Sequence, residues 1–191
     1  MDVEQIRRHP RVSAGSCVVS YSDRQVVIYD HKKTKNQADD DPRIDGHCYL
    51  RQLNEELTPF DFTVRNPRGQ VFHFVAVDKC MFLDSERKQR RCDCLVFTDK
   101  TALFIDLKEN NSVSGRKKGC REAITQICAS IEWFLAENLL ADREEVEAIV
   151  ANGTRRRHPR FTANNIEKTA ELQAIFPNLN VRYGELPFYE L

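Results

Sequence analysis

Residues 92–108, CDCLVFTDKTALFIDLK, constrain the fold more than any other segment of the chain. Two runs of strand-forming apolar residues flank a polar turn at 98–101, so the segment predicts a β-hairpin. Side chains alternate between the two faces of a strand, and both faces of these runs are largely apolar. Such a pattern is typical of central strands, so we expect the hairpin to lie inside a sheet that is covered on each side.

Charged residues interrupt the hydrophobic pattern at the open end of this hairpin. Pairing of the two runs brings Asp93 and Asp106 side by side, and strand alternation puts Lys108 on the same face as Asp106. Two partly buried carboxylates repel each other unless a cation holds them. Carboxylate oxygens suit a hard divalent ion, and a neighbouring lysine can orient or deprotonate a water molecule. The alternative, a structural Asp–Lys pair at a strand end, stays open on these residues alone.

The patterns around the hairpin predict an α/β protein. Isoleucines and leucines recur every three or four residues after Cys120, which indicates an amphipathic helix. Weaker patterns predict a β-hairpin from 17–21 and 25–29, helices over 49–57 and 164–176, strands over 60–64, 71–77, 146–150 and 180–183, and polar loops over 31–45 and 109–119. We therefore expect a mixed central β-sheet flanked by helices on both faces. We expect the domain to span residues 46–191, and residues 1–45 to form an N-terminal extension of hairpin and polar loop.

The order of strand, turn, strand ending in Asp-x-Lys, basic loop and amphipathic helix resembles the PD-(D/E)XK nuclease superfamily, which has the restriction-endonuclease-like fold. The resemblance covers about residues 45–152. Asp93 matches the first acid, and Asp106, Leu107 and Lys108 match the (D/E)-x-K element. It implies Mg²⁺ or Mn²⁺ bound by the two aspartates and the Leu107 carbonyl, with Lys108 at the attacking water. The proline that loosely precedes the first acid in the family is Cys92 here.

The resemblance adds two further candidates. Family members often contribute an acid from the helix before the core strands, and helical geometry in YLRQLNEEL lets only Glu56 reach inward. A solvated position on the flank of that helix is the alternative for Glu56. RecB-like members carry a glutamine on the helix after the lysine strand, and Gln126 occupies that place. The aromatic residue that often follows it is Ser130 here, which departs from the RecB-like pattern.

Basic residues follow the Asp-x-Lys strand closely in the segment GRKKGCR. Its cations are Arg116, Lys117, Lys118 and Arg121. We expect them to contact the phosphates of a nucleic acid. The whole chain has 29 basic and 29 acidic residues, so its net charge gives no indication of a polyanionic partner. DNA is the expected substrate, although the fold also accommodates RNA.

The cysteines and the hydropathy of the chain bear on its compartment. No apolar segment follows Met1 as a signal peptide would require, and no apolar run reaches about 18 residues, so we expect a cytoplasmic protein without a membrane segment. The seven cysteines show no C-x-x-C spacing, and we expect reduced thiols. Cys92 and Cys94 are two apart, so strand alternation predicts that both lie on one face as small buried side chains.

Two functions follow from these observations. The first is a metal-dependent nuclease that hydrolyses phosphodiester bonds, most naturally in DNA, as the nuclease subunit of a restriction, repair or anti-phage system. The second is a catalytically inactive subunit with the same fold, which scaffolds or binds nucleic acid in a larger complex. A small chain with zero net charge is compatible with dependence on a protein partner or on a homo-oligomer. A stand-alone interaction module would leave the two aspartates and the lysine unexplained.

Overall fold

The computed structural model describes residues 1–12, 17–32, 44, 46–51, 58, 60–82, 90–109, 113–141, 145–151 and 163–191. This part of the chain contains three helices and ten strands. The helices are α1 (Val3–Arg7), α2 (Val113–Ala136) and α3 (Ala163–Ile175). The strands are β1 (Val18–Tyr21), β2 (Gln25–Asp30), β3 (Cys48–Leu50), β4 (Phe62–Arg65), β5 (Phe72–Ala76), β6 (Cys94–Phe97), β7 (Thr101–Leu107), β8 (Glu145–Ala151), β9 (Asn180–Glu185) and β10 (Phe188–Glu190).

The strands form two mixed sheets. Six strands follow the order β1-β5-β6-β7-β8-β9, and four follow the order β10-β4-β2-β3. The predicted hairpin is confirmed, because β6 and β7 pair antiparallel with Cys94 opposite Ile105. The chain then crosses through α2, and β8 pairs parallel to β7 with Val150 opposite Asp106. Strand β7 therefore lies in the interior of the six-stranded sheet, between β6 and β8.

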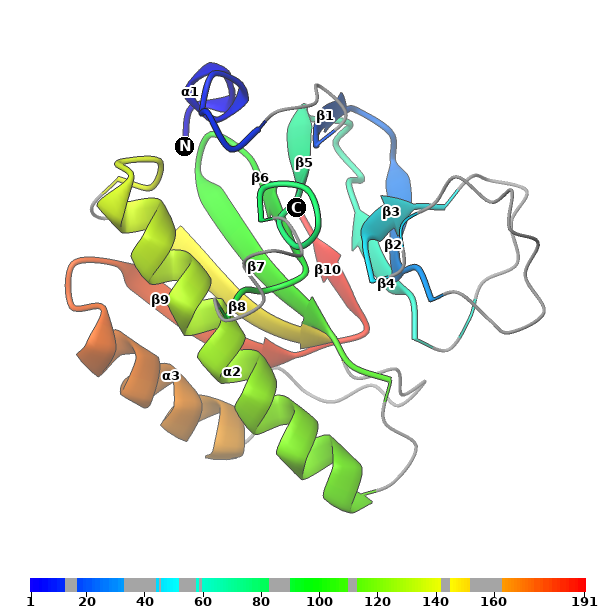
Figure 1. Ribbon diagram of the computed structural model, residues 1–191. Helices are drawn as coiled ribbons and strands as arrows, with labels where there is room; N and C mark the ends of the chain where they lie inside the picture. The colour runs from blue at the N-terminus through cyan, green and yellow to red at the C-terminus, as the bar shows by residue number, and fades with distance from the viewer. Residues whose placement is uncertain are drawn as a thin grey trace.

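Three layers make up the molecule (Figure 1). Helices α2 and α3 cover one face of the six-stranded sheet, and the side chains of all three helices that enter a core, such as Ile6, Ile127 and Leu172, belong to the cluster on that face. The other face packs against the four-stranded sheet, in a second cluster that includes Phe62 and Ile105. The prediction of helices on both faces is therefore not confirmed for the described residues, because among them β2, β3, β4 and β10 form a second sheet on this face and no helix covers it.

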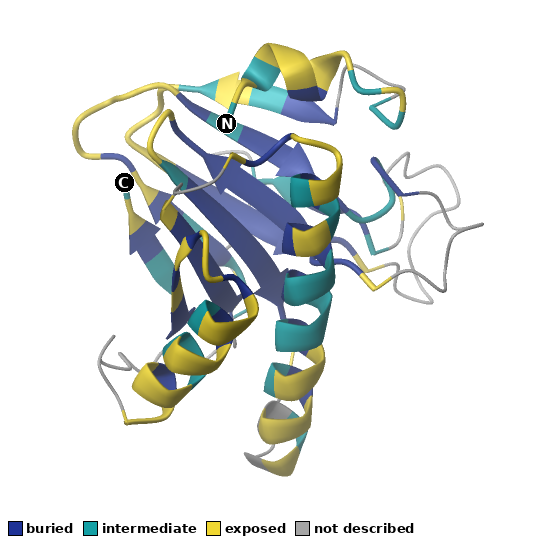
Figure 2. Ribbon diagram, turned by 90° about the vertical axis from the view of Figure 1, so that its left-hand side faces the viewer, coloured by how far each residue is buried: buried dark blue, intermediate teal, exposed yellow. Residues whose placement is uncertain are grey.

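The six-stranded sheet is buried along most of its central strands (Figure 2). Every residue of β6 is buried, and so is every residue of β7 after Thr101. Burial of these side chains against two layers is the main source of stability at the hairpin. The central-strand interpretation of residues 92–108 is confirmed.

Helix α2 begins earlier than the sequence pattern predicts. Residues 113–119, expected in a basic loop, form its first two turns. Each of the two glycines in these turns costs only about 1 kcal/mol relative to alanine, and the lysines between them favour a helix. The downstream turns pack Ala123, Ile127 and Ile131 into the core, which anchors the whole helix. The other predicted long helix is confirmed as α3.

The predicted N-terminal hairpin is wrong. Strand β1 pairs with β5 in the six-stranded sheet, with Val18 opposite Val75. Strand β2 pairs with β3 and β4 in the other sheet, so the short connection at 22–24 carries the chain between sheets. Pairing with β2 also explains why residues 48–50 are a strand, although 49–57 was predicted to be helical. Residues 52–57 lie outside the described residues.

A disulfide joins Cys17 and Cys80, with their Cα atoms 5.7 Å apart. Pairing of β1 with β5 brings Cys17 beside Ala76, whose N–H donates to the Cys17 carbonyl at 3.0 Å. The turn after β5 then returns Cys80 to the same place, so the prediction of reduced thiols is wrong for this pair. The other five cysteines, Cys48, Cys92, Cys94, Cys120 and Cys128, are free thiols. Among the described helices, none is long and apolar enough to cross a membrane.

Candidate active site

The Asp-x-Lys element lies at the carboxyl end of β7, on the side of the sheet that α2 covers. Asp106 is fully buried, and Lys108 Nζ lies 2.6 Å from its Oδ1 atom. Lys108 Nζ also donates a hydrogen bond of 2.9 Å to Gln126 Oε1 on α2. The expected convergence of strand and helix is therefore observed: Asp106, Lys108 and Gln126 form one connected group.

Asp93 joins this group from the neighbouring strand. Its N–H donates to the Ile105 carbonyl at 3.1 Å, which fixes residue 93 beside the end of β7. Its Oδ2 atom accepts a hydrogen bond of 2.6 Å from the Leu107 N–H. The carboxylate of Asp93 is thus bound directly to the backbone of the Asp-x-Lys element, at the open end of the hairpin.

The chain bends at Asp93, and this bend corrects one prediction. The Asp93 carbonyl accepts from both the Val77 and the Asp78 N–H, at 3.0 and 3.2 Å, so two residues face one as in a β-bulge. Cys92 consequently packs in the cluster under α2, whereas Cys94 packs in the cluster between the sheets. The prediction that both cysteines share one face is wrong, because strand alternation does not hold across the bend.

The charges at this site disfavour two ionised carboxylates. Burial raises the pKa of Asp93 well above 3.8, and the charge of Asp106 raises it further. Burial also raises the pKa of Asp106 to about 6, although the Lys108 cation opposes this shift. Burial alone would lower the pKa of Lys108, but the charges of Asp106 and Asp93 outweigh it and raise that pKa. The lysine is therefore a cation at neutral pH, and its single charge would not balance two ionised aspartates.

The remaining predicted residues have different outcomes. Lys117, Lys118 and Arg121 are exposed on the first turns of α2, where Lys118 Nζ lies 3.8 Å from Glu122. These turns project beyond the sheet (Figure 1), and Lys118 is about 12 Å along the helix from Gln126 at 1.5 Å per residue. Arg116 belongs to the same helix, but its side chain is outside the described part. Glu56 also lies outside it.

Sequence reasoning missed two further acids around the end of β7. Asp30, the last residue of β2, comes from the four-stranded sheet, and its charge raises the pKa of both Asp93 and Asp106. Asp78 follows β5, and its carboxylate accepts a hydrogen bond from the buried Arg91. The charge of Asp78 also raises the pKa of Asp106. An acid at the end of the run QVVIYD was the available signal for Asp30. No local pattern marks Asp78.

Ser130 supports the site from α2. Its hydroxyl oxygen accepts from the Cys92 N–H at 2.8 Å, and the hydroxyl donates to the Gln126 carbonyl at 3.1 Å. The serine that replaces the aromatic residue of the RecB-like pattern therefore ties the segment before Asp93 to the turn of α2 that carries Gln126. This bridge helps to fix the distance between the acid and the helix.

The two aspartates can accept a divalent cation. Asp106 Oδ2 is buried and has no hydrogen-bond partner in the described part of the chain. Within the same part, no group of three acidic, histidine or cysteine side chains is arranged to hold a metal. Mg²⁺ commonly takes only one or two carboxylates and keeps several waters, so a pair of aspartates with the Leu107 carbonyl suits it.

Comparison with models of protein families, with curated proteins and with solved structures finds no match. The geometry and the charges of the site are therefore the basis for inferring what this chain does.

Proposed function

We propose that this chain is a Mg²⁺-dependent nuclease of the PD-(D/E)XK type, with a restriction-endonuclease-like core, that hydrolyses phosphodiester bonds in nucleic acid. The observation that carries this proposal is the buried Asp106 carboxylate, whose Oδ2 atom has no hydrogen-bond partner in the described part of the chain. Lys108 Nζ lies 2.6 Å from its Oδ1 atom, and the charge of Asp106 raises the pKa of Asp93. A buried charge that is only partly neutralised is unfavourable for stability, so a functional role explains its presence. DNA is the proposed substrate, and Mn²⁺ is expected to replace Mg²⁺.

Each residue of the site has a distinct proposed role in hydrolysis. Asp93, Asp106 and the Leu107 carbonyl would hold the ion, which supplies Lewis-acid stabilisation of the charge that develops on the phosphate. Lys108 is protonated at neutral pH because its pKa is raised, so it orients the attacking water as a hydrogen-bond donor and adds positive charge. Gln126 holds the ammonium group in position through its bond of 2.9 Å. Lys117, Lys118, Arg116 and Arg121 would bind phosphates further along the substrate.

A second candidate is the inactive nuclease-fold subunit, and one contact favours it. Lys108 Nζ lies 2.6 Å from Asp106 Oδ1, a contact that a purely structural ion pair would also make. In that case the chain would bind or scaffold nucleic acid within a complex. Either function is compatible with a protein partner or a homo-oligomer. The cytoplasmic location stays a prediction, and the Cys17–Cys80 disulfide, a bond that is rare in that compartment, does not favour it.

A cleavage assay with Mg²⁺ or Mn²⁺ on linear, circular, single-stranded and double-stranded DNA tests the proposal, with RNA in parallel. We expect the wild-type protein to cleave, and Asp106→Ala to be inactive. Asp99→Ala is the matched control, because Asp99 is exposed in the turn at the other end of the same hairpin. Wild-type protein that binds no divalent ion and cleaves none of these substrates, with partner proteins supplied, would favour the inactive subunit.

A further inference from the structure

We propose that the cavity between the four-stranded sheet and the end of β7 binds an unpaired nucleobase that carries an exocyclic amino group. This inference rests on the proposed nuclease function and deepens it, because a base in this cavity requires a single-stranded or locally opened substrate. The cavity has a volume of about 380 Å³. Its lining includes Asp30 at the end of β2, Phe60 before β4, and Leu107 and Glu109 at the end of β7. Its size lies within the range of about 300–1,000 Å³ that small-ligand sites show.

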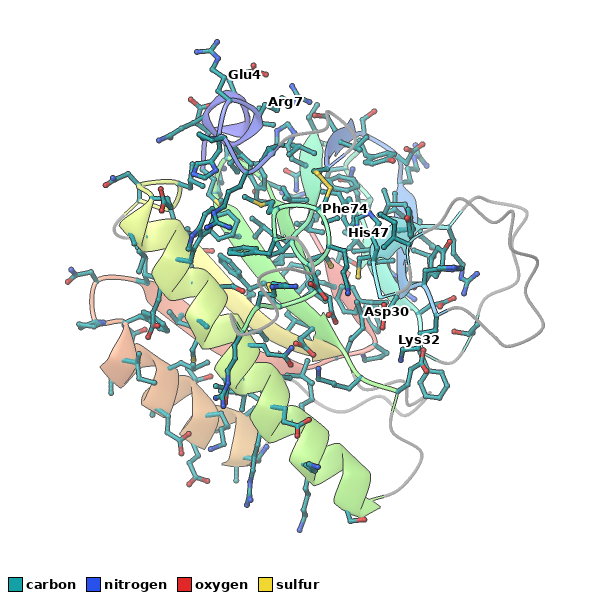
Figure 3. The ribbon with its side chains drawn as sticks, in the orientation of Figure 1. Glu4, Arg7, Asp30, Lys32, His47 and Phe74 are labelled. Carbon is teal, nitrogen blue, oxygen red and sulfur yellow. A yellow bond between two sulfur atoms is a disulfide. The ribbon has the colours of Figure 1, made fainter. Side chains whose placement is uncertain are left out.

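The cavity is adjacent to the candidate active site. Leu107, whose carbonyl is a proposed ligand of the ion, lines it, and the Leu107 N–H binds Asp93. Figure 3 shows Asp30 and Lys32 side by side at the end of β2, and Lys32 Nζ reaches Glu109 after β7 at 3.0 Å. A nucleotide whose base entered the cavity would therefore keep its phosphate close to the end of β7, where hydrolysis is proposed.

The walls of the cavity offer flat surfaces for stacking. The Arg51 guanidinium lies 4.3 Å from the centre of the Tyr29 ring, and the Asp61 carboxylate accepts two hydrogen bonds from it, at 2.6 and 3.1 Å. These contacts hold the guanidinium plane in one orientation. Phe60 adds a partly exposed aromatic ring to the same lining. Proteins bind unpaired bases by stacking them on aromatic rings and on arginine planes of this kind.

The charges of the described lining disfavour a phosphate as the occupant. Among the described residues, its charged side chains are two cations, Lys32 and Arg51, and three carboxylates, Asp30, Asp61 and Glu109. Both cations are already paired, Arg51 with Asp61 and Lys32 with Asp30 and Glu109. A phosphate would meet a net negative surface, whereas a neutral group that donates hydrogen bonds would meet acceptors.

Asp30 identifies the group that the cavity would recognise. The Asp30 carboxylate is part of the lining, and its Oδ1 atom is buried away from the cavity, without a hydrogen-bond partner in the described part of the chain. Its Oδ2 atom is therefore the acceptor that a bound base can reach, since its contact with Lys32, at 3.5 Å, is a long one. A carboxylate accepts hydrogen bonds from the amino group of cytosine in this way. Adenine has such an amino group as well. Thymine has no exocyclic amino group. Carbonyl oxygens flank its only N–H on both sides, and the carboxylates of the cavity would repel these oxygens.

Binding of fluorescent single-stranded homopolymers of about twelve nucleotides, measured by anisotropy in EDTA, tests the inference without cleavage. We expect the wild-type protein to bind oligo(dC) about tenfold more tightly than oligo(dT), and to bind a duplex more weakly than either. Asp30→Asn replaces one carboxylate oxygen with an amide donor and keeps the shape of the side chain. We expect this variant to prefer oligo(dC) over oligo(dT) by less than about twofold. Phe60→Ala should weaken binding of both homopolymers, whereas Phe188→Ala, at a partly exposed ring on β10 outside the cavity, should not.

Each outcome bears on one of the two proposals. Equal wild-type affinity for oligo(dC) and oligo(dT), an unchanged ratio in Asp30→Asn, or no binding of single strands overturns the base-binding inference. Cleavage of all substrates without base preference would leave the nuclease proposal intact and overturn this inference alone. Base-selective binding without any Mg²⁺-dependent cleavage would overturn the nuclease proposal and support the cavity. Circular dichroism of each variant separates loss of binding from loss of fold.

Discussion

Asp106→Asn should make the protein more stable at pH 8 while it abolishes cleavage. The pKa of Asp106 is raised from 3.8 to about 6 by burial, which corresponds to a penalty of about 3 kcal/mol on its ionised form. Asparagine has nearly the same shape, carries no charge and still offers Lys108 an oxygen acceptor. Because Asn also loses the ionic part of that contact, we expect a gain of about 1–3 kcal/mol in the free energy of unfolding.

The pH dependence of this gain provides a second measurement. A raised pKa means that the native state retains its proton longer than the unfolded state, so wild-type stability falls as pH rises from about 4 to above 6. Below that window Asp106 is protonated in both states, and the penalty is absent. Urea unfolding in EDTA at several pH values should therefore show wild type and Asp106→Asn converging toward pH 4.5 and separating toward pH 8.

Two comparisons make this experiment decisive. Asp99→Asn, in the exposed turn of the same hairpin, should change stability by no more than about 0.5 kcal/mol at any of these pH values. Excess Mg²⁺ should stabilise the wild-type protein by mass action but leave Asp106→Asn unchanged. If Asp106→Asn is less stable than wild type at pH 8, or if the difference does not vary with pH, the buried carboxylate is not the source of instability that we infer.

Three further predictions follow from other parts of the molecule. Lys108→Ala should slow cleavage about 100-fold or more while nucleic-acid affinity stays nearly unchanged, and a wild-type cleavage rate would contradict the proposed role. Neutralising Lys117 and Lys118 together should weaken binding of all sequences and lower the slope of log affinity against log salt by about two; an unchanged slope would remove α2 from the interface. Reduction of the Cys17–Cys80 disulfide, which closes a loop of 63 residues, should lower the free energy of unfolding by about 2–4 kcal/mol, and a Cys17→Ser/Cys80→Ser variant should not respond to reductant.

Local periodicity explains what could be predicted from the sequence. The β6–β7 hairpin and the meeting of Lys108 with Asp106 follow from strand alternation, which depends only on neighbouring residues. The contact with Gln126 could be anticipated from the resemblance to a family in which a helix follows the lysine strand. These predictions concern segments that are adjacent in the chain, where the short connections leave few alternative arrangements.

The features that could not be predicted from the sequence depend on pairing between strands that are distant in the chain. Turn residues at 22–24 and 66–69 predict that the chain changes direction, but they do not specify the sheet to which the next strand belongs. Strands β4 and β5 are separated by such a turn, yet they lie in different sheets. The arrival of Asp30 near the site, and the approach of Cys17 to Cys80, depend on this allocation of strands. Neither could be derived from the residues around them.

The bend at Asp93 connects one wrong prediction with the construction of the site. In a regular antiparallel pair the Leu107 N–H would donate to a backbone carbonyl, but here it donates to the Asp93 side chain. The same bend turns Cys92 toward α2 and allows Ser130 to accept from its N–H. Asp93 therefore closes the sheet at this end in addition to any role in catalysis. Asp93→Ala would leave the Leu107 N–H without its acceptor, so loss of cleavage in that variant would combine a structural and a chemical effect. Asp106, whose Oδ2 atom has no hydrogen-bond partner in the described part of the chain, is the residue at which the two effects can be separated.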